Sequence, residues 1–147
     1  MKNYLIIAGL FLNVMCVCTG DTRDNIIDFA KQYIGRPYRY AGDSPDGFDC
    51  SGFVCFVYRN SLGINLPHSS TGIWESGREV RIEDAKPGDI IVFANRGRID
   101  HVALLINSST MIHAVSDGSK TGVLISPLND SYFGPRIVGV RSYIEKE

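Results

Sequence analysis

Cys50 is the residue in this chain best placed to do chemistry. It follows a stretch rich in Gly, Pro and Asp (residues 42–47) and precedes an apolar run at residues 53–58. A loop that leads into an apolar segment is typical of a helix start, where free backbone N–H groups and the helix dipole favour a thiolate. A single cysteine near apolar residues is more often a small buried side chain. The polar neighbours Asp49 and Ser51 and the turn-rich approach favour the reactive interpretation.

Two of the three histidines, His101 and His113, lie in apolar segments downstream of this cysteine. Residues 102–106 and 111–115 are bounded by turn-forming residues, which predicts a β-hairpin with one histidine on each strand. A turn centred near Ser108 would bring the two imidazoles together, and strand alternation lets both point to one face. A cysteine with one histidine as base and another as orienter is suited to covalent acyl transfer.

The surrounding pattern predicts helices first and an antiparallel sheet afterwards, which is the α+β class. One helix is expected from residues 22–25 to Gly35, and another from Cys50 to about Leu62, ending at Gly63. A helical turn is expected at 72–77 and an edge strand at 79–82. Further strands are expected at residues 90–93, 102–106, 111–115, 123–125 and 137–143. The cysteine-bearing helix must pack on the sheet that carries the histidines.

Several short motifs occur in a fixed order over residues 26–143. They are residues 35–42, 48–54 around Cys50, 66–70, 86–93, and the histidine segments at 101–103 and 112–114. In these motifs and their spacing the chain resembles the NlpC/P60 family of cell-wall cysteine peptidases. The resemblance implies a papain-like α+β fold, with N-terminal helices, the nucleophile at a helix N-terminus, and a C-terminal antiparallel β-sheet packed against them.

The resemblance also implies a role for each catalytic residue. Cys50 would be the nucleophile, His101 the general base and acid, and His113 the residue that fixes the tautomer of His101. The hydroxyl of Tyr38 and the backbone N–H of Cys50 would stabilise the tetrahedral oxyanion. Ordinary aromatic packing is the alternative interpretation of this tyrosine.

Four further positions match family residues that contact the substrate: Asp49, Ser51, Ser69 and Tyr40. For both serines the alternative is helix capping or turn formation, and for the tyrosine it is packing. The function implied is hydrolysis of peptidoglycan stem peptides (muropeptides) between a γ-D-glutamyl residue and a diamino acid, typically meso-diaminopimelate. The alternatives are a papain-like amidase or transacylase acting on another amide, and a non-catalytic envelope protein that binds wall peptides.

Three positions depart from the family pattern. Ala41 and Ala103 replace glycines, and these small-for-small changes should leave the backbone course intact. His68 stands where an arginine is common, which should weaken any anion contact made there.

The first twenty residues have the pattern of an export signal. Lys2 precedes an apolar stretch too short for a comfortable membrane span, and small residues near Gly20 predict a mature start at Asp21. A lipoprotein leader acylated at Cys16 or Cys18 is the alternative. We therefore expect a signal peptide at residues 1–20, one peptidase domain at residues 21–147, and an exported protein that is secreted or lipid-anchored in the cell envelope.

Composition excludes several classes of function. The chain has a formal net charge of −1, or −2 without Lys2, and no Lys/Arg cluster, which argues against nucleic-acid binding. Cys50 and Cys55 are five residues apart on one expected helix, so they cannot form a disulfide, and Cys55 is expected in the core. No zinc-site spacing occurs, and we expect no metal and no cofactor.

Overall fold

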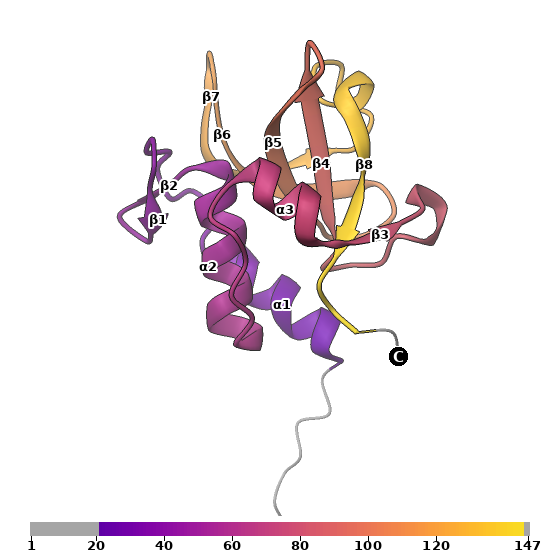
Figure 1. Ribbon diagram of the computed structural model, residues 1–147. Coiled ribbons are helices and arrows are strands. Elements are labelled where there is room, and N and C mark those ends of the chain that lie inside the picture. The colour runs from indigo at the N-terminus through magenta and orange to yellow at the C-terminus, as the bar shows by residue number, and fades with distance from the viewer. Residues whose placement is uncertain (1–20, 146–147) are drawn as a thin grey trace, which may run out of the picture.

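The computed structural model describes residues 21–145 and places the helices N-terminal to the main sheet (Figure 1). The helices are α1 (Thr22–Lys31), α2 (Cys50–Leu62) and α3 (Ser70–Ser76), and a small hairpin of β1 (Asp43–Ser44) and β2 (Gly47–Phe48) precedes α2. The main sheet contains β3 (Arg78–Val80), β4 (Ile90–Asn95), β5 (Arg98–Leu105), β6 (Thr110–Asp117), β7 (Lys120–Pro127) and β8 (Ile137–Ser142). Short 3-10 turns occupy Ile82–Asp84 (η1) and Gly134–Arg136 (η2).

The main sheet is antiparallel with the order β3-β8-β4-β5-β6-β7. The α+β class and the strands expected in the C-terminal half are confirmed, as is the hairpin that carries both histidines. Three bounds differ from the prediction. The first helix ends at Lys31 rather than at Gly35. The helical turn expected at 72–77 is a helix that begins at Ser70, and the expected edge strand stops at Val80 because Ile82 enters η1.

Helix α2 has clear start and stop signals. The carboxylate of Asp49 accepts a hydrogen bond from the backbone N–H of Gly52 at 2.6 Å, which satisfies one of the unpaired donors of the first turn. Gly63 ends the helix in the left-handed conformation with φ of 69°. The sequence prediction of a helix from Cys50 to Gly63 is therefore confirmed.

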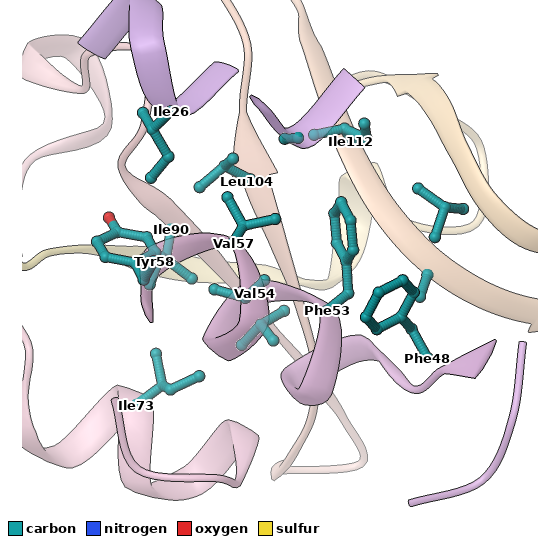
Figure 2. Close-up of a cluster of buried hydrophobic side chains, with 14 of the residues drawn as sticks. Ile26, Phe48, Phe53, Val54, Val57, Tyr58, Ile73, Ile90, Leu104 and Ile112 are labelled. Carbon is teal, nitrogen blue, oxygen red and sulfur yellow. The ribbon is translucent and has the colours of Figure 1, made fainter. Parts of the chain in front are cut away.

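One hydrophobic core lies between the helices and the first face of the sheet. Figure 2 shows Ile26 of α1 and Phe53, Val54 and Val57 of α2 close to Leu104 of β5. All of these side chains are fully buried. Burial of such side chains is worth about 1.5–3 kcal/mol each, so this layer fixes α2 against the sheet.

A second, smaller core covers the opposite face of the sheet. It contains Phe93 of β4, Ala103 and Leu105 of β5, Met111 of β6, and Phe133, which precedes η2. Alternation along β5 and β6 places His101 and His113 on this second face.

Within residues 21–145, no helix is long and apolar enough to cross a membrane. The predicted signal peptide and the cysteines at positions 16 and 18 lie outside the described residues.

Candidate active site

Cys50 is the first residue of α2 and is partly buried. Its Sγ lies 3.6 Å from the hydroxyl oxygen of Ser70 at the start of α3, and 4.0 Å from the carbonyl oxygen of Asp100 in β5. The thiol therefore lies where two helix starts meet the first half of β5.

The turn before this cysteine requires a glycine at position 52. A Cβ on Gly52 would lie 2.0 Å from the carbonyl oxygen of Gly42 and 2.9 Å from the carboxylate of Asp49. The backbone N–H of Asp49 also donates to that carbonyl oxygen of Gly42 at 2.9 Å. This close approach holds the loop at residues 42–49 against the start of α2, where Cys50 lies.

His101 and His113 form a hydrogen-bonded chain that ends at Ser126. Nε2 of His101 lies 2.8 Å from Nδ1 of His113, and Nε2 of His113 lies 2.9 Å from Oγ of Ser126. A neutral imidazole has one donor and one acceptor nitrogen. If each Nε2–H donates along the chain toward Ser126, the lone pair on Nδ1 of His101 is left free to accept a proton.

Both imidazoles are packed among aromatic rings. The ring of Phe133 lies 4.9 Å from each histidine ring, and Phe93 lies 5.4 Å from His101. Burial lowers the pKa of His101 well below its usual value, and the neighbouring His113 and Arg136 lower it further. Burial also lowers the pKa of His113 to about 4. Both rings are therefore neutral at neutral pH.

The sequence analysis expected the helix start to favour a thiolate at Cys50, and the structure does not support this. Burial raises the pKa of Cys50 above its ordinary value, although hydrogen bonds from Ser70 and from backbone N–H groups oppose this change. The helix start alone does not determine the protonation state, because desolvation of the sulfur outweighs it. The resting pair consists of a neutral thiol and a neutral imidazole.

Helix packing alone did not predict how Cys50 and His101 come to line the same cavity. Helix α2 packs on the first face of the sheet, whereas His101 and His113 lie on the second face. Strands β5 and β6 pair through Leu104–Ile112 and Leu105–Met111, whereas β6 and β7 pair from Thr110 to Asp117. The sheet is therefore open between β5 and β6 at the level of the histidines, where Cys50 reaches the same cavity as His101.

That cavity has a volume of about 150 Å³ and contains Cys50, His101 and Tyr38 in its wall. Tyr38 is held by a β-bridge to Phe48. Burial raises the pKa of the Tyr38 phenol, and negative charge on Cys50 and Asp49 raises it further. The phenol therefore stays protonated and can donate a hydrogen bond to an oxyanion in the cavity.

None of the four predicted substrate contacts, Asp49, Ser51, Ser69 and Tyr40, lines this cavity. Asp49 caps α2 and accepts from the hydroxyl of Ser51 at 3.3 Å, and Ser69 caps α3 by accepting from Gly72 at 3.0 Å. The capping interpretation therefore describes Ser69, whereas the hydroxyl of Ser51 donates to the carboxylate that caps α2. Tyr40 is 88 % exposed. Their contact with substrate stays a prediction.

Sequence reasoning missed three residues at the site: Ser70, Ser126 and Phe133. Ser70, rather than the neighbouring Ser69, contacts the thiol. Ser126 continues an apolar strand that we expected to end at residue 125. Its single hydroxyl in that apolar strand was the sequence feature that could have indicated a polar partner there. Phe133 lies far along the chain, and its sequence neighbourhood gave no sign of the contact with the histidines.

The remaining expectations concern Cys55 and the departures from the family pattern. Cys55 is not a fully buried core residue, since it is partly exposed and its thiol donates to the carbonyl oxygen of Pro67 at 3.4 Å. His68 and Cys55 line the same small cavity, which is separate from the one that contains Cys50. Ala41 adopts a φ of 57°, the left-handed region that favours glycine, with the surrounding turn intact. Among residues 21–145, no group of three or more His, Cys, Asp or Glu side chains could hold a metal ion.

A larger cavity of about 440 Å³ lies elsewhere, between β3 and residues 81–89. Its wall includes the ion pairs Arg23–Asp89 and Arg81–Asp84. No cysteine or histidine of residues 21–145 lines it. We assign the chemistry to the smaller cavity because it contains the thiol and the imidazole.

Comparison with known proteins gives a consistent result. Residues 35–142 match the sequence model of the NlpC/P60 family. The chain is 38 % identical over 124 residues to a γ-D-glutamyl-L-lysine dipeptidyl-peptidase of Bacillus cereus, covering 82 % of this chain and 36 % of that protein. It is 36 % identical over 121 residues to a γ-DL-glutamyl hydrolase of Bacillus subtilis, covering 80 % of this chain and 29 % of that protein.

Solved structures show the same architecture. A crystal structure of an NlpC/P60 family protein from Bacillus cereus superposes with a TM-score of 0.78 at 36 % identity, covering 84 % of this chain and 40 % of that one. The NlpC/P60 domain of the peptidoglycan hydrolase SagA superposes with a TM-score of 0.71 at 28 % identity, covering 82 % and 97 %. The chain spans about a third of the length of the first curated relatives. The papain-like α+β fold predicted from the sequence is confirmed.

Proposed function

The chain belongs to the NlpC/P60 family, and on this premise we propose that it is a peptidoglycan hydrolase. It acts as a cysteine endopeptidase on stem peptides and cleaves the amide bond between γ-D-glutamate and the following diamino acid. The observation that carries the proposal is the cavity in which Cys50 lies together with His101, whose far nitrogen is hydrogen-bonded to His113. The activities for which the two Bacillus relatives are named support the γ-glutamyl bond as the target.

The first half of the reaction forms a thioester. Nδ1 of His101 accepts the thiol proton while Sγ of Cys50 attacks the carbonyl carbon of the γ-glutamyl amide. The oxyanion accepts hydrogen bonds from the hydroxyl of Tyr38 and the backbone N–H of Cys50. The imidazolium of His101 then protonates the leaving nitrogen, and the C–N bond breaks.

The second half releases the acyl group. A water molecule enters, His101 accepts its proton, and the hydroxide attacks the thioester carbonyl. The Cys50 sulfur leaves and recovers a proton from His101. His113 accepts the Nε2–H of His101 throughout, which supports the positive charge that forms on the ring in each half-reaction. The scheme uses no metal and no cofactor.

The test is digestion of purified muropeptides followed by mass spectrometry of the products. Wild type should release a peptide that begins with the diamino acid, and Cys50→Ala should release none. Cys55→Ser is the matched control because Cys55, the other cysteine within residues 21–145, lies outside the cavity. This variant should retain activity. Binding of muropeptides by wild type without any cleavage would contradict the proposal and favour a non-catalytic wall-binding protein.

We also propose that the protein is exported to the cell envelope or beyond it, because its proposed substrate lies there. Residues 1–20 act as the signal peptide, so the mature protein begins at Asp21, or at an acylated cysteine if the leader is of the lipoprotein type. N-terminal sequencing of the protein recovered from the envelope tests this. Recovery with Met1 intact would contradict cleavage.

A further inference from the structure

The cavity beside Cys50 carries charged groups that the proposed chemistry does not use: Asp100, Asp117 and Arg136. Arg136 and Asp100 neutralise each other, since Nη2 of the guanidinium lies 2.6 Å from a carboxylate oxygen. The guanidinium also lies over the ring of Tyr132 at 4.5 Å. The positive charge of Arg136 is therefore already paired with a carboxylate and packed on an aromatic ring.

Asp117 is the one carboxylate in this wall whose charge is not compensated. It ends strand β6, directly opposite Lys120 of β7. The ammonium of Lys120 lies 3.6 Å from a carboxylate oxygen of Asp130 instead. Within residues 21–145, Asp117 has no ion-pair partner. The cavity thus carries one net negative charge.

The chemistry determines which half of the substrate occupies this cavity. His101 must return its proton to the leaving nitrogen, so that nitrogen lies within hydrogen-bond reach of the imidazole. The cavity has His101 in its wall and extends along β6 from Ala114 to Asp117. The leaving amino acid therefore enters the cavity.

The volume of the cavity and its direction along β6 fit a single amino-acid side chain. A volume of about 150 Å³ is well below that of a pocket for a drug-sized ligand. Strand alternation places Asp117 on the same face of β6 as His113 and Val115. A side chain that extends from the reacting centre along this strand meets the carboxylate at its far end.

We propose that Asp117 is a specificity-determining residue that binds the side-chain ammonium of the leaving amino acid. The inference rests on the proposed function, and it explains at the level of one residue why a diamino acid is selected at this position. A residue of the same length without the ammonium leaves Asp117 without its partner. The ion pair is exposed to solvent at the end of the strand, and pairs of this kind change affinity by roughly three- to fivefold.

The experiment compares two synthetic substrates that differ only in that ammonium. They are L-Ala-γ-D-Glu-L-Lys-D-Ala and the same peptide with norleucine in place of lysine. Wild type should show a kcat/KM about three- to fivefold higher for the lysine peptide, decreasing as salt is added. Asp117→Asn should cleave both peptides equally. Asp28→Asn is the matched control, because it removes the same charge from an exposed site on α1 and should retain the preference.

A binding measurement separates this inference from the proposed reaction. The dipeptides L-Lys-D-Ala and norleucyl-D-Ala are titrated into Cys50→Ala, with and without Asp117→Asn, and followed by NMR. Tighter binding of the lysine dipeptide that depends on Asp117 supports the inference even if no substrate is cleaved, in which case the proposed function alone fails. Equal binding of the two dipeptides, or equal kcat/KM in wild type, would overturn it.

Discussion

His113 has a hydrogen-bond partner on each ring nitrogen, and these partners bear on which nitrogen of His101 carries the proton. It bonds His101 through Nδ1 and Ser126 through Nε2. In the tautomers that the proposed reaction uses, the Ser126 hydroxyl accepts from Nε2–H of His113, so Nδ1 of His113 accepts the Nε2–H of His101. The free nitrogen of His101 is thereby the one that can take the thiol proton. In the proposed reaction, His113 is a positioning residue, whereas His101 moves protons.

This division of roles predicts different kinetics for variants of the two histidines. His101→Ala should lose turnover almost as completely as Cys50→Ala, with non-additive losses in the double variant. His113→Asn retains a hydrogen-bond acceptor for His101 and should keep measurable activity. His113→Ala should lose roughly 10²–10⁴-fold. Single-turnover hydrolysis of a defined muropeptide measures all four. If His113→Asn is as inactive as His101→Ala, the assignment is wrong.

The buried histidines also predict loss of stability in acid. Their ordinary pKa is about 6.5, and burial lowers the pKa of His113 to about 4 in the folded protein. Between these values the unfolded chain binds a proton that the folded protein does not, so stability falls as pH decreases from about 6.5 to 4. The shift corresponds to about 3 kcal/mol for His113, and His101 adds to it in the same direction.

Thermal unfolding at a series of pH values measures this dependence. His113→Asn should show a shallower decrease of Tm between pH 6.5 and 4 than wild type, because one titrating group has been removed. His68→Asn is the control, since that side chain is exposed and should leave the slope unchanged. Parallel slopes for wild type and His113→Asn would contradict the prediction.

At the scale of elements, the parts of the site that the sequence predicted are those with local signals. The cap at Asp49 and the stop at Gly63 define α2, and turn residues bound the histidine hairpin. The contacts of Ser126 and Phe133 with the histidines depend on strand register and on the return of the chain after β7, which no local pattern encodes. The opening between β5 and β6 is likewise a property of paired strands rather than of either segment.

The turn before α2 stores strain that one substitution should relieve. Ala41 has a φ of 57°, where a Cβ costs about 1–2 kcal/mol. Ala41→Gly should therefore stabilise the protein by about 1 kcal/mol, after the extra entropy of glycine in the unfolded chain, and raise Tm by roughly 3–5 °C. Ala85→Gly is the matched control, because Ala85 has a φ of −64° and the same change should lower Tm. A lower Tm for Ala41→Gly would contradict the account of strain.

At the scale of the whole molecule, a buried carboxylate joins the helical layer to the sheet. Asp89, which precedes β4, lies 3.1 Å from Nη1 of Arg23 in α1. It also accepts hydrogen bonds from the backbone N–H of Lys86 at 2.9 Å and the hydroxyl of Ser142 in β8 at 2.6 Å. Arg23 donates further to the carbonyl oxygen of Pro87 at 2.8 Å. One ion pair thus connects the first helix, the turn before β4 and the last strand.

A double-mutant cycle tests how this connection contributes to stability. Arg23→Met should cost about 3–5 kcal/mol, because it leaves the Asp89 carboxylate buried without a cation. Asp89→Asn should cost a similar amount, since Arg23 then loses its counter-charge. The double variant should cost less than the sum by about 1–3 kcal/mol. Urea unfolding provides these free energies, and Arg81→Met at an exposed ion pair is the control expected to have little effect.

The same variants should leave catalysis intact well below their Tm. The ion pair lies at the larger cavity between β3 and residues 81–89, whereas Cys50 and His101 line the smaller one. Loss of the pair removes a link between layers, but α2 keeps its own apolar contacts with β5 and β6. We therefore expect kcat on a defined muropeptide to stay within about twofold of wild type, since neither side chain lines the cavity with Cys50 and His101 and sites without shared partners are nearly independent. A large drop in kcat in folded Arg23→Met would show that the position of α1 controls the geometry of the thiol and the imidazole.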